Sequence, residues 1–76
     1  MKTKQSGEGY DCSRISSKIW GWAKTNGVSI GDMAVYAMMA ESTMYARLKH
    51  PKDFRMSELM DLSKLMGVTV EALIGA

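Results

Sequence analysis

The fold of this chain is decided by residues 29–51, which read SIGDMAVYAMMAESTMYARLKHP. Apolar residues in the first half of this stretch recur at i, i+3, i+4 and i+7, which predicts a short helix that buries one stripe: Ile30, Met33, Ala34 and Ala37. Ser29 stands at the N-cap position of this helix, and Asp32 follows it at capping-box spacing. A second helix is expected over residues 41–49, and Pro51 ends it, because the residue before a proline is pushed out of helical geometry.

Three further segments have helical periodicity. The first covers residues 14–26 and ends at Gly27; the second starts near Phe54 and ends at Gly67; the last is short, with Thr69 as its N-cap. Strand-like alternation is absent from the sequence. The pattern therefore predicts an all-α fold, a compact five-helix bundle in one domain over residues 13–76, with residues 1–12 as a flexible N-terminal arm.

Several large side chains have an expected place in this bundle. The periodicity puts four methionines on buried faces, namely Met33, Met44, Met56 and Met66. Trp20 and Trp22 cannot both face the same core, so one of them is expected at the surface.

Composition excludes several classes of protein. The chain has 76 residues, a net charge of +2, one cysteine and one histidine, which leaves no internal disulfide and no multi-cysteine zinc site. The sequence contains no apolar run long enough to span a membrane, and no nucleophile, base and orienting group at usable spacing. We therefore expect a cytoplasmic protein without enzymatic activity, cofactor, metal, small-molecule substrate or membrane partner.

The two helices of residues 29–49 are separated by only a few residues, from Ala37 to Ala40. A connection this short holds two helices near right angles and leaves the second free to project, which is the helix-turn-helix geometry. If Met44 and Leu48 face the core, the opposite face of the second helix presents four residues: Ser42, Tyr45, Ala46 and Lys49.

Residues 29–51 resemble the helix-turn-helix of phage-repressor-like regulators of the Cro and lambda-repressor type. Small phage members read Ser-x-x-Thr-Leu-x-x-x-Leu-Lys-Asn-Pro where this chain reads Ala40-Glu-Ser-Thr-Met-Tyr-Ala-Arg-Leu-Lys-His-Pro51. The stretch from Phe54 to Leu73 is similar to the fourth and fifth helices of that family, so the likeness covers about residues 15–75. This resemblance implies a sequence-specific regulator of transcription that binds double-stranded DNA, with residues 41–49 in the major groove.

The chain departs from the family pattern at three positions. Met38 replaces a common turn glycine, Ile30 replaces a glutamine that touches phosphate, and Ala40 replaces a Ser or Thr cap. A glycine in that turn matters if the backbone there requires a positive φ. The alanine leaves the start of the second helix weakly capped.

Spacing and resemblance together assign the DNA contacts. The expected base contacts are Glu41, Ser42, Tyr45 and Ala46, and the expected phosphate contacts are Thr43, Arg47, Lys49, Lys52 and Arg55. Alternatives stand beside three of these: Arg47 can pack along the preceding helix, Tyr45 can be a half-buried packing residue, and Glu41 can serve only as a favourable charge at a helix start.

Apolar residues expected at the surface point to a protein partner. They are Val35, Tyr36 and Met38, together with Leu73 and Ile74 at the end of the chain. We expect a homodimer through the C-terminal region, because one small domain contacts few bases and dimers of this kind span two half-sites. The competing hypothesis is a protein-interaction module on the same helical scaffold without DNA binding, which Ile30 and Glu41 favour.

Overall fold

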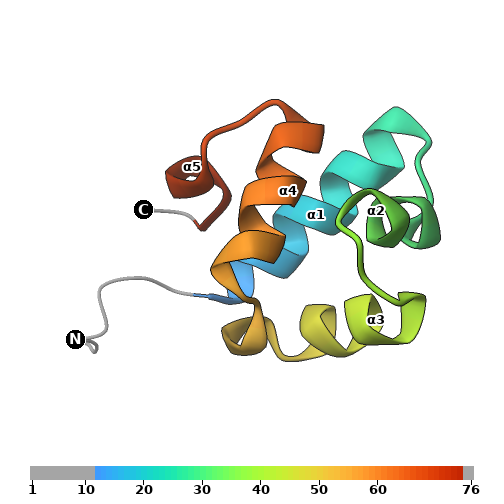
Figure 1. Cartoon of the computed structure of the whole chain (residues 1–76). Helices are drawn as coiled ribbons and strands as arrows, with labels where there is room; N and C mark the ends of the chain where they lie inside the picture. The colour runs from blue at the N-terminus through green and yellow to red at the C-terminus, as the bar shows by residue number, and fades with distance from the viewer. Residues whose placement is uncertain (1–11, 75–76) are drawn as a thin grey trace.

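The computed structural model describes residues 12–74, and within this range it contains five α-helices, one 3-10 helix and no strand. The helices follow in the order α1 (Ser13–Asn26), α2 (Ile30–Tyr36), α3 (Glu41–Lys49), the 3-10 turn η1 (Pro51–Asp53), α4 (Met56–Met66) and α5 (Val70–Ile74) (Figure 1). The predicted all-α fold is thus confirmed. No helix among the described residues has both the length and the apolarity needed to cross a membrane.

The predicted N-terminal arm, residues 1–12, lies outside the described residues except for its last member. Cys12 is half-buried, packs against the hydrophobic core and occupies the position before α1. Its carbonyl accepts a hydrogen bond from the Ile15 backbone N–H at 3.0 Å. Cys12 is therefore in contact with the helical domain.

The helix starts follow from local capping. Ser29 Oγ accepts a hydrogen bond from the Asp32 N–H at 3.0 Å, as expected from the capping-box spacing. Thr69 Oγ1 likewise accepts from the Ala72 N–H at 3.0 Å at the start of α5. Ala40, at the N-cap of α3, provides no side-chain cap.

The helix ends also match the expected signals. Gly27 and Gly67 follow α1 and α4 with φ of 66° and 72°, a left-handed conformation that glycine adopts without steric cost. Helix α3 ends at Lys49, just before Pro51. The η1 turn after it has no counterpart in the predicted elements, and it delays the start of α4 from Phe54 to Met56.

One hydrophobic core joins all five helices. Its largest fully buried side chains come from every helix and are Ile15, Ile19, Met33, Met44, Leu62 and Leu73. The prediction for Met33 and Met44 is confirmed, whereas Met66 is only half-buried. The prediction for Met56 is wrong, because its side chain is 59% exposed. Helical side chains lean toward the N-terminus, so the first residue of α4 has no preceding turn to pack on.

The C-terminal helix is part of this core. Leu73 is fully buried, which corrects the expectation that it closes the chain uncovered at the surface. Helix α5 packs against both α1 and α4, and Lys18 Nζ donates a hydrogen bond to the Ala72 carbonyl. Ile74 packs partly buried against the same core.

Helix α3 lies at one edge of the molecule (Figure 1) and contacts three other helices, α1, α2 and α4. Helix α2 packs along it. Ser16 Oγ on α1 donates a hydrogen bond to the Leu48 carbonyl at 2.6 Å, which satisfies a free carbonyl in the last turn of α3. Arg47 forms an ion pair with Glu58 on α4, with 3.1 Å between Nε and Oε1. These contacts fix the orientation of α3 while one face of it stays exposed.

The connection between α2 and α3 contains a strained residue. Met38 has a φ of 58°, the one non-glycine residue with positive φ in the described range of residues 12–74. This conformation costs a residue with a Cβ about 1–2 kcal/mol. The Met38 side chain is 89% exposed, so it makes little packing that would offset the strain. A glycine at this position would avoid the strain.

We expect Met38→Gly to raise the free energy of unfolding by about 1 kcal/mol, after allowance for the greater entropy of glycine in the unfolded chain. Urea denaturation followed by circular dichroism measures this change. Val35→Gly is the matched control, because Val35 is also exposed but lies within α2. A glycine inside a helix should lower stability by about 0.5–1 kcal/mol relative to alanine. Equal destabilisation by both variants would contradict strain at Met38.

Candidate functional site

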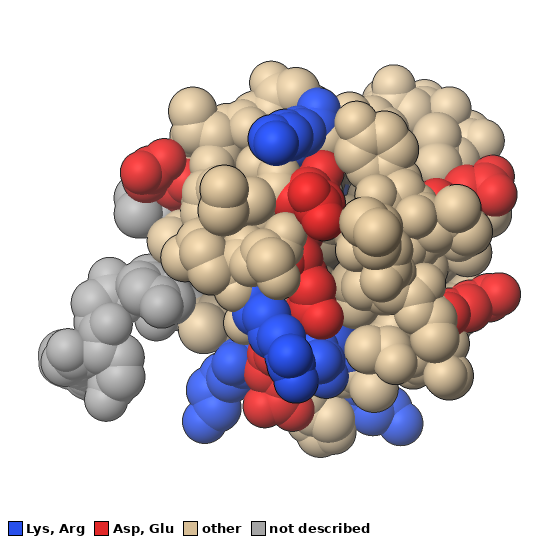
Figure 2. Space-filling model, in the orientation of Figure 1, with Lys and Arg blue, Asp and Glu red and all other residues tan. Residues whose placement is uncertain are grey.

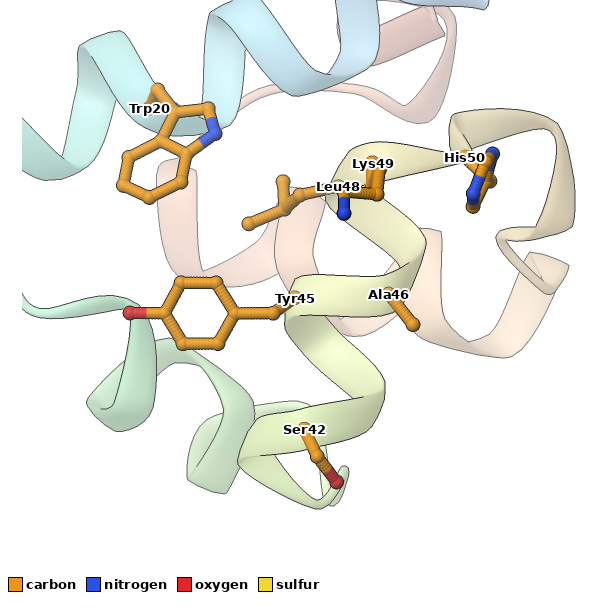
Figure 3. A pocket seen from close by; sticks show the side chains of 7 residues that line it. All are labelled: Trp20, Ser42, Tyr45, Ala46, Leu48, Lys49 and His50. Carbon is orange, nitrogen blue, oxygen red and sulfur yellow. The ribbon is translucent and has the colours of Figure 1, made fainter.

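The outward face of α3 borders a surface hollow of about 670 Å³. The four residues that spacing assigned to this face all line it, and the remaining lining residues are Trp20, Leu48 and His50 (Figure 3). Ser42, Ala46 and Lys49 are exposed, while Met44 and Leu48 are buried. The structure thus brings together the strip of Ser42, Tyr45, Ala46 and Lys49, which we call the α3 strip.

Trp20 is a member of this site that the sequence reasoning missed. It comes from α1 and is 47% exposed, so it is the surface tryptophan of the pair, whereas Trp22 is half-buried against the core. Its ring centroid lies 6.2 Å from that of Tyr45, with the two planes tilted by 48°. A signal was present in the sequence, because Trp20 falls off the apolar face of α1 that Ile15 and Ile19 define.

Tyr45 packs against a neighbouring ring and is also exposed, and its contact with a base edge stays a prediction. Its ring packs against Trp20, yet Tyr45 is 45% exposed. It also lines a second, smaller hollow of about 360 Å³ beside the junction of α1 and α2. Tyr45 is therefore both a packing residue and a surface residue at the edge of the α3 strip.

Glu41 lies at the start of α3 and leans back toward α2. A Cβ placed on Gly31 would lie 3.2 Å from the Glu41 Cδ and Oε1 atoms, so the carboxylate is in close contact with the first turn of α2. The Glu41 residue is nevertheless exposed. This placement separates Glu41 from the residues that line the hollow and supports its role as a charge near helix starts.

Arg47 forms an ion pair with Glu58 on α4. Its guanidinium donates to both carboxylate oxygens of Glu58, at 3.1 Å to Oε1 and 3.5 Å to Oε2. Glu58 Oε1 also accepts from the Arg55 backbone N–H at 2.9 Å. This pairing holds Arg47 against α4, and its contact with phosphate stays a prediction. Thr43, another of the expected phosphate contacts, is half-buried.

Three of the expected phosphate contacts lie at the end of the α3 strip and just after it. Lys49, Lys52 and Arg55 are all exposed. Figure 2 shows Lys and Arg side chains gathered along the lower edge of the molecule, where Figure 1 draws α3, η1 and the start of α4. One acidic residue, Asp53, lies between Lys52 and Arg55 in the sequence. A projecting helix face with hydroxyls and aromatic rings, next to ammonium and guanidinium groups, suits contact with a polyanion.

Residues 12–74 contain no group of three or more His, Cys, Asp or Glu side chains arranged to hold a metal ion. Cys12, the single cysteine, lies at the start of α1 and is half-buried. Comparison of the chain with protein-family models, curated proteins and solved structures found no match.

Proposed function

We propose that this protein is a sequence-specific double-stranded DNA-binding regulator of transcription of the phage-repressor type, with α3 as its recognition helix. The observation that carries the proposal is the exposed α3 strip, which ends at the cation Lys49 and is followed by the exposed cations Lys52 and Arg55. In this proposal α2, the connection that contains Met38, and α3 form the helix-turn-helix, which agrees with the resemblance of residues 29–51.

The dimensions of α3 suit this role. An α-helix with its side chains is about 10–12 Å across, and the major groove of B-DNA is about 12 Å wide. Within the groove, Ser42 and Tyr45 would hydrogen-bond to base edges, and the Ala46 methyl group would contact a thymine methyl. Glu41 stays a candidate for a cytosine amino group, from its position at the helix start. Lys49, Lys52 and Arg55, with Thr43, would hold the flanking phosphates and set the register.

Binding as a homodimer is part of the proposal. Two half-sites about 34–36 Å apart would double the number of bases that a single short helix can read. Because Leu73 is inside the core, a dimer contact in the C-terminal region would have to use other apolar residues, and Met60 and Val68 are exposed there. Stoichiometric titration of a palindromic duplex should then reach saturation at two chains per duplex.

Fluorescence anisotropy of a labelled mixed-sequence duplex at several salt concentrations tests the proposal. Each phosphate contact by a cation contributes about −0.9 to the slope of log K against log salt concentration. Three cations on one domain therefore predict a slope of about −3, and two domains on one duplex about −5. Undetectable binding at low salt, or binding without a salt slope, would refute DNA binding.

A second candidate is a protein-interaction module without DNA binding. It is favoured by the exposure of Val35 at 75% and of Tyr36 at 52% on α2, next to Met38. Exposed apolar residues that lie close together in this way are typical of protein contact sites. A flat DNA titration, with retained fold by circular dichroism, would favour this candidate over the first.

A further inference from the structure

The hollow beside α3 is formed by two helices that are distant in sequence. Trp20 on α1 stands on one side of it, and Leu48, Lys49 and His50 at the end of α3 stand on the other (Figure 3). The hydrogen bond from Ser16 Oγ to the Leu48 carbonyl holds these two helices together along the same edge. The hollow therefore lies where α1 and α3 meet.

Two aromatic rings in contact form one wall of the hollow. Trp20 and Tyr45 contact one another at a centroid distance of 6.2 Å, within the 4.5–7 Å range of favourable aromatic pairs. The same two rings also line the smaller hollow beside the α1–α2 junction. The Trp20–Tyr45 pair thus borders two surface depressions.

The chemistry of the larger hollow suits an anion that carries an apolar body. Its walls include the rings of Trp20 and Tyr45 and the Leu48 side chain, and none of its seven lining residues is acidic. In Figure 3 the indole nitrogen of Trp20 lies at the edge of the ring that faces Leu48 and Lys49. The Lys49 ammonium has three donors and the indole has one, and neither group can accept. Both donors border one depression.

We propose that this hollow seats one sugar-phosphate unit of the DNA backbone, at the edge of the groove that α3 enters. Trp20 donates its indole N–H to a phosphate oxygen, Lys49 neutralises the phosphate charge, and the deoxyribose lies against the Trp20 and Tyr45 rings. Trp20 is then a positioning contact that carries no base information. This inference rests on the proposed DNA binding, and it adds a residue of α1 to the interface.

The salt dependence of DNA binding distinguishes the contribution of the Trp20 indole N–H from that of the Lys49 ammonium. Trp20→Phe keeps an aromatic ring against Tyr45 but removes the N–H. We expect it to weaken binding about tenfold at every salt concentration, because an uncharged donor releases no counterion and leaves the salt slope unchanged. Lys49→Gln removes a charge and should make the slope shallower by about 0.9. Trp22→Phe is the matched control and should bind like the wild type.

Tryptophan emission gives a readout that does not depend on affinity. In the Trp22→Phe variant Trp20 is the sole tryptophan, and in the Trp20→Phe variant Trp22 is. Saturation with an unlabelled mixed-sequence duplex should change the emission of the first variant and leave that of the second unchanged. Inorganic phosphate at the same ionic strength should leave the emission of both variants unchanged. In the proposal, the hollow binds a phosphate only when the rest of the duplex holds that phosphate in position.

The outcomes distinguish the two proposals. If the wild type binds no duplex, DNA binding fails and this inference fails with it. If the wild type binds with the expected slope, but Trp20→Phe binds equally well and Trp20 emission does not respond, DNA binding stands and the seat at Trp20 is refuted. A response of Trp20 to inorganic phosphate alone would mark a free-anion site and overturn the assignment to the DNA backbone. If the Trp20→Phe variant does not fold, the Trp22→Phe variant alone tests the proposal. A change in its emission on saturation with duplex supports the seat at Trp20, and an unchanged emission refutes it.

Discussion

Ala46→Glu is expected to lower the affinity for duplex DNA about 100-fold, since placing like charges against one another in an interface costs several kcal/mol. Ala46 is exposed in the middle of the α3 strip and lines the hollow between α1 and α3. A carboxylate at this position would point into a groove bordered by phosphates. Alanine and glutamate are both good helix formers, so the free energy of unfolding should change by less than about 1 kcal/mol.

Ala72→Glu provides the control. Ala72 is also exposed and helical, but it lies on α5, away from α3 in Figure 1. Both variants lower the net charge by one unit, so a general effect of charge would weaken both equally. Anisotropy titration at one low salt concentration compares them with the wild type. Equal affinity of the Ala46→Glu variant and the wild type would remove α3 from the interface.

Glu58→Ala is expected to have the largest effect on stability, a decrease of about 2 kcal/mol in the free energy of unfolding. Glu58 and Arg47 have side chains only 12% and 19% exposed, and their pairing joins α4 to α3. The same carboxylate accepts the Arg55 backbone N–H at the start of α4. Its removal leaves a largely buried guanidinium without its partner and a helix start without its acceptor. The partial exposure of the pair keeps the cost below the roughly 3–5 kcal/mol of a fully buried one.

Glu58→Gln separates the two contributions. Glutamine can still accept from the Arg55 N–H, so only the charge is lost, and the expected decrease is about 1 kcal/mol. A double-mutant cycle with Arg47→Gln, measured by urea denaturation, gives the coupling between the two side chains. A coupling energy near zero would mean that the ion pair does not hold α3 against α4.

The elements that local sequence controls could be predicted. The hydroxyls of Ser29 and Thr69 cap the helices that follow them, and Gly27 and Gly67 end the helices before them. Each signal acts within a few residues and needs no knowledge of the tertiary fold. The η1 turn has no such signal, because Pro51 marks only the end of α3 and is equally compatible with a loop.

The candidate site was only partly predictable for a different reason. The spacing of Ser42, Ala46 and Lys49 depends on the 3.6-residue period of one helix, and it correctly placed them on the exposed face of α3. Arg47 and Trp20 depend on partners from other helices, namely Glu58 and Tyr45. No periodicity within one helix reveals such partners. The burial of Leu73 likewise depends on how α5 folds back against α1 and α4.

The most direct test of the central claim, that the exposed face of α3 binds duplex DNA, is a map of amide and indole N–H chemical shifts during titration with a mixed-sequence duplex at low salt. The expected result is that the largest changes fall on Ser42, Ala46, Lys49 and the Trp20 indole N–H and disappear as salt is raised. No changes at all, or changes confined to the exposed apolar surface of Val35 and Tyr36, would contradict the claim.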